Sequence, residues 1–535
     1  MPMSRPATAL LLIALYLLMC GAVWWRHRRR LRQAAEEAAA LLPAADAGPP
    51  VLVLHASQTG QAEEIAWQTA RSLHLAGMPV RVAALGEIDR AALMAARHAL
   101  FIASTHGEGD APDSAAAFAS DLMSASAPSS PADVSDGAIG LSHLQVGVLA
   151  LGDSTYAHFC GFGRTLDAWL RERGAQPLFE RIDVDRADPQ ALAHWRQGLS
   201  HFAGTADLAE WEAPVFTPWR LSARRHLNPG SQGGPVFHLE LLPVDGAPLP
   251  SWEAGDLVQV EIASSSWEAG AGIATSGHAA ESARAGPGSA TDDDAHRPRE
   301  YTIASLPSDG RVELMVRRTT REDGSPGLAS GWLTERLPLD GRVALRLRPH
   351  ASFRIGANAD RPLILIGNGT GLAGLRAHLK ARAAARVTTP PSGSTMATTG
   401  TTGTTGTTGT TGTTAATSAT PMRAVIPPAW LLFGERQSAH DAHYRDEIEA
   451  WQRDGLIAQA DWAFSRDQSE RVHVQHLLAR HAPRLRAWIA DGAALYVCGS
   501  LQGMAGAVDA VLRETLGEAE VDGLIRHGRY RRDVY

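Results

Sequence analysis

The chain has few cysteines, a single lysine and no excess of positive charge. Its three cysteines, Cys20, Cys160 and Cys498, lie far apart in 535 residues without a C-x-x-C pair, which argues against a disulfide framework or a zinc or iron–sulfur site and favours a reducing compartment. The 50 lysines and arginines are outnumbered by 57 aspartates and glutamates, and Lys380 is the only lysine. A net charge of −7 gives no electrostatic reason to bind nucleic acid. With 44% hydrophobic residues, the chain can build two or three cores of ordinary size.

One long uncharged run lies near the N-terminus. Residues 7–25 are long enough, as a helix, to cross most of a bilayer core. Arg5 precedes the run and five arginines follow it by residue 32, and this asymmetry predicts a cytoplasmic C-terminal side. A cleaved signal peptide is the alternative, because residues 45–47 resemble a small-residue cleavage site. The sequence therefore predicts one N-terminal transmembrane helix, a single-pass membrane location and cytoplasmic catalytic domains.

Two further segments have too little apolar content to fold into a core. Residues 264–296 are rich in Ser, Ala and Gly, and residues 388–420 contain a repeated Gly-Thr-Thr triplet. Such compositions bury no apolar face. We expect both segments to be low-complexity insertions at the surface.

Three continuous apolar runs each lead into a polar loop. Residues 51–55, 99–103 and 146–150 are typical of buried parallel strands. Since parallel strands end at one edge of a sheet, the three loops that follow them are expected to meet where ligands bind in open α/β folds.

The loops offer groups that suit a phosphorylated ring. The hydroxyls of Ser57 and Thr59 stand with Gly60 just before a helical stretch, where unpaired N–H groups favour an anion. Tyr156 offers a plane on which a flat ring, such as a flavin, can stack. Taken alone, the first loop is more typical of a solvated turn capped by Ser57 or Thr59.

The middle of the chain has the alternation of an antiparallel barrel. Residues 235–243 and 256–262 alternate polar and apolar side chains around turn signals. The run that follows the first insertion contains Arg299, a forked donor for a pyrophosphate, Tyr301, a plane for a ring, and Thr302, a hydroxyl that can reach a flavin edge. In isolation this run is also compatible with a plain edge strand.

The C-terminal third begins with an apolar strand, the glycine loop Gly367-Asn368-Gly369-Thr370-Gly371 and a helix. Such a loop lets the backbone approach a pyrophosphate at a helix N-terminus. Alone, a glycine-rich turn is a weak signal.

Taken together, these motifs resemble those of the diflavin reductases, the family of cytochrome P450 reductase and the sulfite reductase flavoprotein. The resemblance rests on SQTGQAEE, STHGEGDAPD and LGDSTYAHFCGFGRTLD in the first module, REYT and GLAS in the second, and GNGTG, WAFSRDQSERVHVQ, ALYVCGS and the terminal GRYRRDVY in the third. It implies a flavodoxin-like α/β domain, an antiparallel β-barrel FAD domain and an α/β NADP-binding domain of ferredoxin–NADP reductase type, with FMN, FAD and NADPH as cofactors and no metal.

The resemblance also implies a role for individual residues. The FMN phosphate would be held by Ser57, Gln58, Thr59, Gly60 and Ala62. The ring would be bordered by Ser104, Thr105, His106, Gly107 and Gly109. The third loop would contribute Gly152, Asp153, His158, Phe159, Cys160 and the stacking Tyr156.

In the two remaining modules the assignments concern FAD and NADPH. FAD would be held by Arg299, Tyr301 and Thr302 and by Gly327, Leu328, Ala329 and Ser330. NADPH would be bound by Gly369, Thr370 and Gly371 at the pyrophosphate and by Ser465, Arg466, Arg471 and Gln475 around the 2′-phosphate. Thr302, Cys498, Asp533 and Tyr535 would surround the nicotinamide, with Tyr535 covering the FAD ring.

The chain departs from the family pattern at several positions. His106 stands where cytochrome P450 reductases usually carry a second stacking tyrosine, His473 replaces a common tyrosine, and Gly374 replaces a usual proline. No helical connecting domain interrupts the barrel, because only the insertion of residues 264–296 occupies that place.

The predicted organisation is an anchor, a linker, three modules and a second linker. The expected bounds are 1–32 for the anchor, 33–50 for the first linker, 51–204 for the FMN domain, 205–225 for the second linker, 226–356 for the FAD barrel and 361–535 for the NADP-binding domain. The expected activity is transfer of electrons from NADPH through FAD and FMN to an external acceptor, with a haem protein as first choice. The alternatives are service in assimilatory sulfite reductase, a membrane ferric reductase, and a flavin-free scaffold protein.

Overall fold

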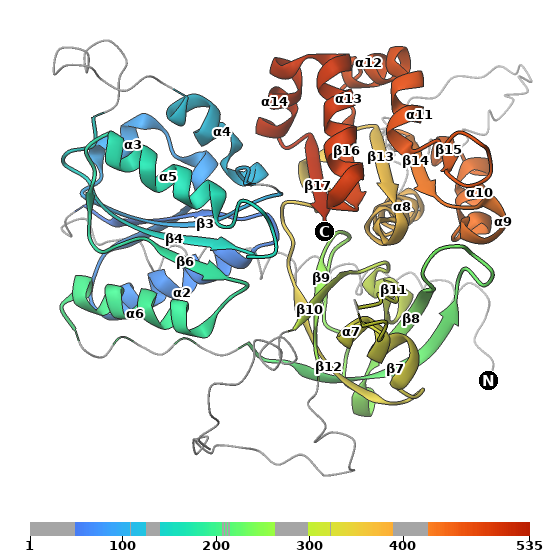
Figure 1. The fold of residues 1–535 in the computed structure, drawn as a ribbon, viewed down its shortest axis with the longest axis horizontal. Helices are drawn as coiled ribbons and strands as arrows, with labels where there is room; N and C mark the ends of the chain where they lie inside the picture. The colour runs from blue at the N-terminus through green and yellow to red at the C-terminus, as the bar shows by residue number, and fades with distance from the viewer. Residues whose placement is uncertain are drawn as a thin grey trace, which may run out of the picture. The chain divides into compact units, whose positions relative to one another are not determined.

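The computed structural model describes residues 49–107, 109–124, 140–205, 208, 211, 214–262, 298–321, 323–388 and 426–535. The chain divides into two compact units, the first ending at Pro214 and the second beginning at Val215. Both are drawn in Figure 1, and each is described by itself. The predicted anchor at residues 7–25, the first linker up to residue 48, and nearly all of both predicted insertions lie outside the described residues.

The first unit is built on a parallel sheet in the order β2-β1-β3-β4-β5, with β6 also pairing with β4. Its strands are β1 (Val51–Ala56), β2 (Val80–Ala84), β3 (His98–Ser104), β4 (Gln145–Gly152), β5 (Gln176–Pro177) and β6 (Ile182–Asp185). Its helices are α2 (Gln61–Leu75), α3 (Arg90–Ala95), α4 (Ala116–Phe118), α5 (Gly161–Glu172) and α6 (Pro189–Ala203). The three strands predicted from apolar runs are confirmed as β1, β3 and β4.

Both faces of this sheet are buried. β1 sends Val51 and Val53 into the core cluster that it shares with α2 and α6, and Leu52 and Leu54 into the cluster that it shares with α3, α4 and α5. Figure 1 shows α2 and α6 on one side of the sheet and α3 and α5 on the other. A strand buried on both faces needs apolar residues at every position, which explains the continuous runs in the sequence.

The second unit begins with an antiparallel sheet in the order β10-β9-β12-β7-β8-β11. Its strands are β7 (Thr217–His226), β8 (Val236–Pro243), β9 (Leu257–Glu261), β10 (Arg299–Thr302), β11 (Val312–Arg317) and β12 (Arg342–Arg348), and the short helix α7 (Leu328–Gly331) precedes β12. A bridge between Ile303 and Leu314 joins the two ends of the sheet.

The linker expected over residues 205–225 is corrected by strand β7, which begins at Thr217. Trp219 and Leu221 are buried in the core of the antiparallel sheet. Only these two residues of β7 are buried, and the half-buried Arg220 and Arg224 leave the alternation too short to indicate a strand from the sequence.

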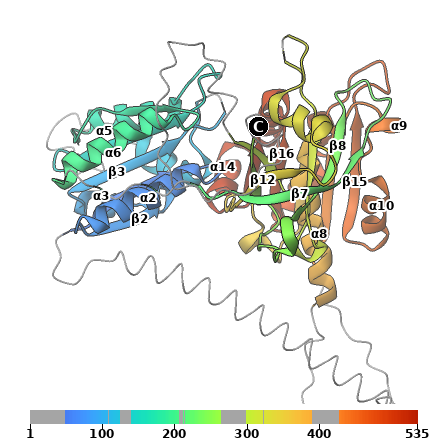
Figure 2. The same cartoon turned by 90° about the horizontal axis from the view of Figure 1, so that it is seen from below.

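A five-stranded parallel sheet in the order β15-β14-β13-β16-β17 completes the second unit. Its strands are β13 (Leu363–Asn368), β14 (Ala429–Glu435), β15 (Ile457–Phe464), β16 (Ala494–Gly499) and β17 (Tyr530–Val534). Its helices are α8 (Leu372–Thr388), α9 (Ser438–Asp441), α10 (Arg445–Arg453), α11 (Val474–Arg480), α12 (Ala482–Ala490), α13 (Gly506–Leu516) and α14 (Glu518–Arg526). Figure 2 shows the unit from below, with α10 beside β15.

The antiparallel and parallel sheets of the second unit share a core. Val236 and Met315 of the antiparallel strands lie in one apolar cluster with Leu365 of β13. The guanidinium of Arg376, on α8, donates to the Ala304 carbonyl oxygen at 2.8 Å, and it pairs with Glu313 of β11 and Glu447 of α10, both at 2.6 Å. The two sheets of this unit are therefore joined by apolar packing and by a buried charge network.

The α/β part of the predicted fold class is confirmed, whereas the assignment of the antiparallel sheet to FAD stays a prediction. The membrane location expected from residues 7–25 finds no support in the described residues, because no helix among them has both the length and the apolar character needed to cross a bilayer; the predicted span itself lies outside them.

Candidate functional site

In the first unit, the predicted ligand loops meet at one edge of the sheet. β3 lies between β1 and β4, with Ala56 opposite Ala103 and Ser104 opposite Leu151. The loops that follow these strands therefore start side by side, as the sequence predicts.

The first loop is held by residues that the sequence reasoning did not select. The N–H of Ser57 donates to Oγ of Ser114 at 2.9 Å, and that hydroxyl donates to the Ser57 carbonyl oxygen at 2.9 Å. Gln58 Nε2 donates to Asp113 Oδ2 at 3.3 Å, and the Asp113 N–H donates to Gln58 Oε1 at 3.1 Å. Ser114 is 57 residues from Ser57, and Asp113 is 55 residues from Gln58. Their contacts with the first loop therefore become visible only in the folded structure.

Two hydroxyls at this edge are buried without a hydrogen-bond partner. Within the part of the chain that the structure describes, Oγ of Ser57 and Oγ1 of Thr105 have none. A buried hydroxyl without a partner is costly unless a ligand supplies the hydrogen bond. Gly60 has φ of +88° immediately before the fifteen-residue helix α2, so the loop turns directly onto the N-terminal end of that helix. These features fit a bound phosphate.

The second and third loops approach each other closely. A Cβ on Gly161 would lie 2.8 Å from the Cα of Gly109, so a side chain would not fit between the two loops. Within the third loop, a Cβ on Gly152 would lie 2.7 Å from the backbone N of Cys160. Cys160 precedes α5 in the left-handed conformation with φ of +56°. Its thiol is buried, which raises its pKa to about 12.

The remaining predicted FMN residues differ in exposure. Tyr156 is half-buried, and its N–H donates to the Asp153 carbonyl oxygen at 3.1 Å. His106 is buried, whereas His158 is exposed. Ala62 lies in the core, so only its backbone is placed to meet a phosphate. Thr59, Ser104, Gly107 and Phe159 are half-buried along the same loops.

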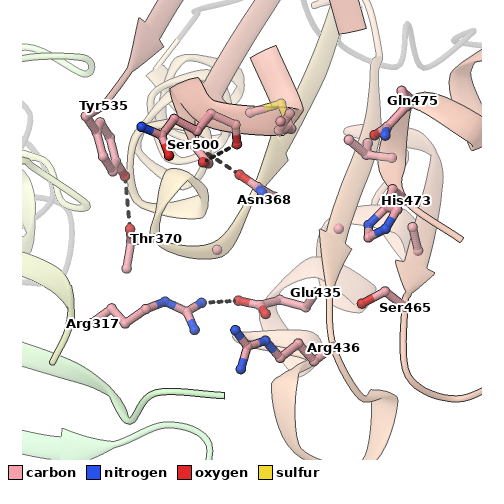
Figure 3. A pocket seen from close by; sticks show the side chains of 17 residues that line it. Arg317, Asn368, Thr370, Glu435, Arg436, Ser465, His473, Gln475, Ser500 and Tyr535 are labelled. Carbon is pink, nitrogen blue, oxygen red and sulfur yellow. Dashed lines mark hydrogen bonds and ion pairs between the residues drawn. The ribbon is translucent and has the colours of Figure 1, made fainter. Parts of the chain in front are cut away.

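In the second unit, a cavity of about 540 Å³ opens at the carboxyl ends of the parallel strands. Figure 3 shows side chains from β11, β13, β14 and the end of the chain around it. Its lining includes five of the residues predicted to bind NADPH or FAD: Gly369, Thr370, Ser465, Gln475 and Tyr535.

Other predicted nucleotide residues stand behind or beside this lining. Gly371 packs against β16, where any Cβ would collide with the carbonyl oxygen of Cys498. Arg466 and Arg471 are exposed. They lie near His473, which lines the cavity and whose pKa is lowered by burial, by His476 and by these two arginines.

The cavity also contains charged residues that the sequence reasoning missed. Arg317, Glu435 and Arg436 line it, and Arg317 Nη2 lies 2.8 Å from Glu435 Oε1. Arg317 and Glu435 end strands 118 residues apart, and no sequence spacing connects them. The sequence signal that could have indicated a site here is the placement of Glu435 and Arg436 directly after the apolar run 429–434.

The four residues predicted around the nicotinamide come from three separate parts of the chain. The hydroxyl of Thr302 donates to Asp533 Oδ2 at 2.7 Å, and the Cys498 thiol donates to the same oxygen at 3.4 Å. Burial and the neighbouring carboxylate of Asp533 raise the pKa of Cys498 well above its ordinary value. Tyr535 Oη donates to Thr370 Oγ1 at 3.1 Å, as Figure 3 shows. Tyr535 lines the cavity, whereas Thr302, Cys498 and Asp533 meet as buried side chains that are not part of its lining.

The predicted FAD residues lie on β10 and around α7. Burial raises the pKa of Tyr301 to about 12. Oγ of Ser330 accepts hydrogen bonds from the Thr319 N–H at 3.1 Å and contacts the Thr319 hydroxyl at 2.8 Å. A Cβ on Gly327 would collide with that same hydroxyl. Arg299 is half-buried, and Leu328 and Ala329 form the first turn of α7.

One group of side chains in the second unit has the composition of a metal site. His238, Glu240 and Glu313 place potential ligand atoms within 4.8 Å of one another. Arg311 pairs with both glutamates at 3.2 and 3.0 Å, and Arg376 pairs with Glu313. Because arginines already neutralise the carboxylates, we assign the group to the charge network that joins the sheets.

Comparison with known proteins agrees with the motif resemblance. A flavodoxin family model matches residues 53–195. The sulfite reductase [NADPH] flavoprotein alpha-component of Photobacterium profundum is 26% identical, over 92% of this chain and 90% of that protein. Its counterparts in Neisseria meningitidis serogroup B and Vibrio parahaemolyticus are 27% and 28% identical, over 92% and 90% of this chain and 91% and 86% of theirs.

Proposed function

This chain is a relative of the diflavin reductases along about nine tenths of its length, and we propose that it is an NADPH-dependent oxidoreductase that carries FMN in its first unit and FAD in its second. The observation that carries the proposal is the meeting of the buried side chains of Thr302, Cys498 and Asp533 in the second unit. These residues come from the antiparallel sheet, the fourth parallel strand in sequence and the last strand of the chain. Ordinary core packing gives no reason for a buried carboxylate to be shared by a hydroxyl and a thiol there.

The comparisons favour a sulfite reductase haemoprotein as the electron acceptor, which the sequence offers as an alternative. The relatives are flavoprotein components of sulfite reductase, whereas a general haem-protein reductase was the first choice. We therefore propose that the electrons pass to the sulfite-reducing haemoprotein that such a flavoprotein serves.

In the first unit, the edge formed by the three loops would hold FMN. The unpartnered hydroxyls of Ser57 and Thr105 and the N-terminal end of α2 are the groups we assign to its phosphate. Tyr156 is the side chain that we assign to the ring. Ser114 and Asp113 would keep the first loop in shape through the hydrogen bonds described above.

In the second unit, the cavity would hold NADPH. When bound, NADPH supplies a hydride, and the two flavins divide its electron pair into single electrons. Gly371 packs closely on β16, where a side chain would not fit. This packing would let the backbone of the glycine loop approach the pyrophosphate of the nucleotide. We assign selection of the 2′-phosphate to Ser465, which lines the cavity, and to the exposed Arg466 and Arg471. Asp533 would orient the Thr302 hydroxyl and the Cys498 thiol beside the nicotinamide.

The proposal is tested on the purified full chain. We expect both FMN and FAD on extraction, reduction of the flavins by NADPH in preference to NADH, and sulfide production when a sulfite reductase haemoprotein is added. A colourless protein would support the scaffold alternative. Flavin reduction that prefers NADH would contradict the assignment of Ser465, Arg466 and Arg471, and electron delivery to other haem proteins but not to the sulfite-reducing one would return the acceptor to the first choice.

A further inference from the structure

Arg317 and Glu435 form an ion pair inside the cavity, with unequal exposure. Arg317 ends β11 of the antiparallel sheet and Glu435 ends β14 of the parallel sheet, and their side chains meet at 2.8 Å, as Figure 3 shows. The side chain of Glu435 is 4% exposed and that of Arg317 is 27% exposed. The carboxylate is thus enclosed, while part of the guanidinium remains open to the cavity.

The guanidinium faces the glycine loop. Arg317 Nη2 lies 3.3 Å from the position that a Cβ on Gly369 would take, and Gly369 has φ of +58°. On its other side, Glu435 Oε1 lies 3.5 Å from Nε2 of the fully buried His443. Glu435 therefore lies between His443 and Arg317 and fixes where the guanidinium stands.

This arrangement has a chemical consequence for an anion in the cavity. A guanidinium has five N–H donors in a rigid fork, and the bond to Glu435 leaves the others for a phosphate. Without Arg317, the carboxylate of Glu435 would lose its guanidinium partner in the cavity wall and would repel a phosphate.

We propose that Arg317 binds the pyrophosphate of the pyridine nucleotide and that Glu435 is the positioning residue that holds Arg317 at the glycine loop. The inference rests on the proposed nucleotide binding and adds to it a side chain from the antiparallel sheet. Since NADPH and NADH share the pyrophosphate, Arg317 contributes to the binding of both. The residues assigned to the 2′-phosphate contribute to NADPH alone.

The experiment measures nucleotide binding to the flavin-loaded full chain by calorimetric titration and competition. Arg317→Gln should weaken NADP⁺ and ADP-ribose by a similar factor, about 30-fold or more. It should leave adenosine 2′-monophosphate unchanged, because that ligand lacks the pyrophosphate. Arg318→Gln is the matched control, since Arg318 is the next residue and pairs with Glu335 at 3.0 Å; it should change none of the three affinities.

A second set of variants separates positioning from structural support. In Glu435→Gln the amide oxygen can still accept from Arg317, so NADP⁺ affinity should change by less than about threefold, whereas Glu435→Ala should weaken it by about tenfold. Adding Glu435→Gln to Arg317→Gln should recover part of the lost affinity, because it removes the unpaired carboxylate.

Several results would overturn the inference. It fails if Arg317→Gln lowers the melting temperature without changing nucleotide affinity, if adenosine 2′-monophosphate weakens as much as ADP-ribose, or if the double variant binds no better than Arg317→Gln. Absence of NADP⁺ binding to the wild-type chain would instead refute the proposed function on which the inference rests.

Discussion

Replacement of Thr302 by valine tests the centre of the proposed site with almost no change of shape. The substitution removes the hydroxyl that donates to Asp533 Oδ2 at 2.7 Å. A short hydrogen bond to a carboxylate is of the charge-assisted kind and contributes about 1.5–3 kcal/mol. The Cys498 thiol at 3.4 Å is a weak donor and compensates little. If the bond orients Asp533 for the reaction, its loss should slow flavin reduction by NADPH roughly 10- to 150-fold.

The assay is stopped-flow reduction of the bound flavin, with NADPH and with NADPH deuterated at the transferred position. Thr302→Ser, which keeps the hydroxyl, is the control and should stay within about threefold of wild type. Equal rates in Thr302→Val and Thr302→Ser would refute the reasoning, as would a slow variant whose isotope effect and NADPH affinity show that only binding was lost.

Three further predictions concern groups whose surroundings are fully described. Because burial raises the pKa of Cys160 to about 12 and that of Cys498 well above its ordinary value, we expect neither to be alkylated by iodoacetamide at pH 8 in the folded protein, as peptide mapping by mass spectrometry would check; labelling of either would contradict its burial. Burial lowers the pKa of His55 from 6.5 to about 4, so only the unfolded chain takes up a proton there as the pH falls from 6.5 to 4. The free energy of unfolding should fall by about 3 kcal/mol over this range. In urea unfolding, His55→Gln should therefore show a flatter pH dependence than the wild-type chain. Gly371→Ala should lower the free energy of unfolding by about 3 kcal/mol, because its Cβ would collide with the Cys498 carbonyl oxygen. Gly523→Ala in α14 should raise the free energy of unfolding by roughly 1 kcal/mol, because the space around Gly523 is open. The reverse order of melting temperatures would contradict the packing argument.

The sequence predicts best those elements whose burial is written into consecutive residues. β1, β3 and β4 are buried on both faces, so their apolar runs are continuous and their order along the chain places the three loops together. Strand β7 escapes prediction because only two of its residues, Trp219 and Leu221, are buried, with Arg220 between them and no buried residue after them. A long charged side chain can leave its strand for solvent without disturbing the face that packs, and composition alone then indicates a linker.

The site divides in the same way. Nothing local relates Thr302 to Asp533, which are 231 residues apart; only the resemblance to a known family suggested that they meet, and the structure brings them together. Arg317 and Glu435 were missed because each ends a strand and meets the other only through packing of the two sheets. His473, by contrast, could be marked as a departure from the family pattern, and it does line the cavity.

The guanidinium of Arg376, shared between α8, α10 and the antiparallel sheet, limits how this chain can be divided by recombination. A gene fragment that encoded only the C-terminal parallel sheet would produce a protein in which this cation had lost its Glu313 partner and the Ala304 carbonyl. The apolar cluster that the two sheets share, which includes Phe353 and Met315, would lose part of its residues or be exposed to water. Recombination can therefore exchange the second unit as a whole. A crossover between its two sheets would instead produce two fragments with exposed apolar surface, which would aggregate.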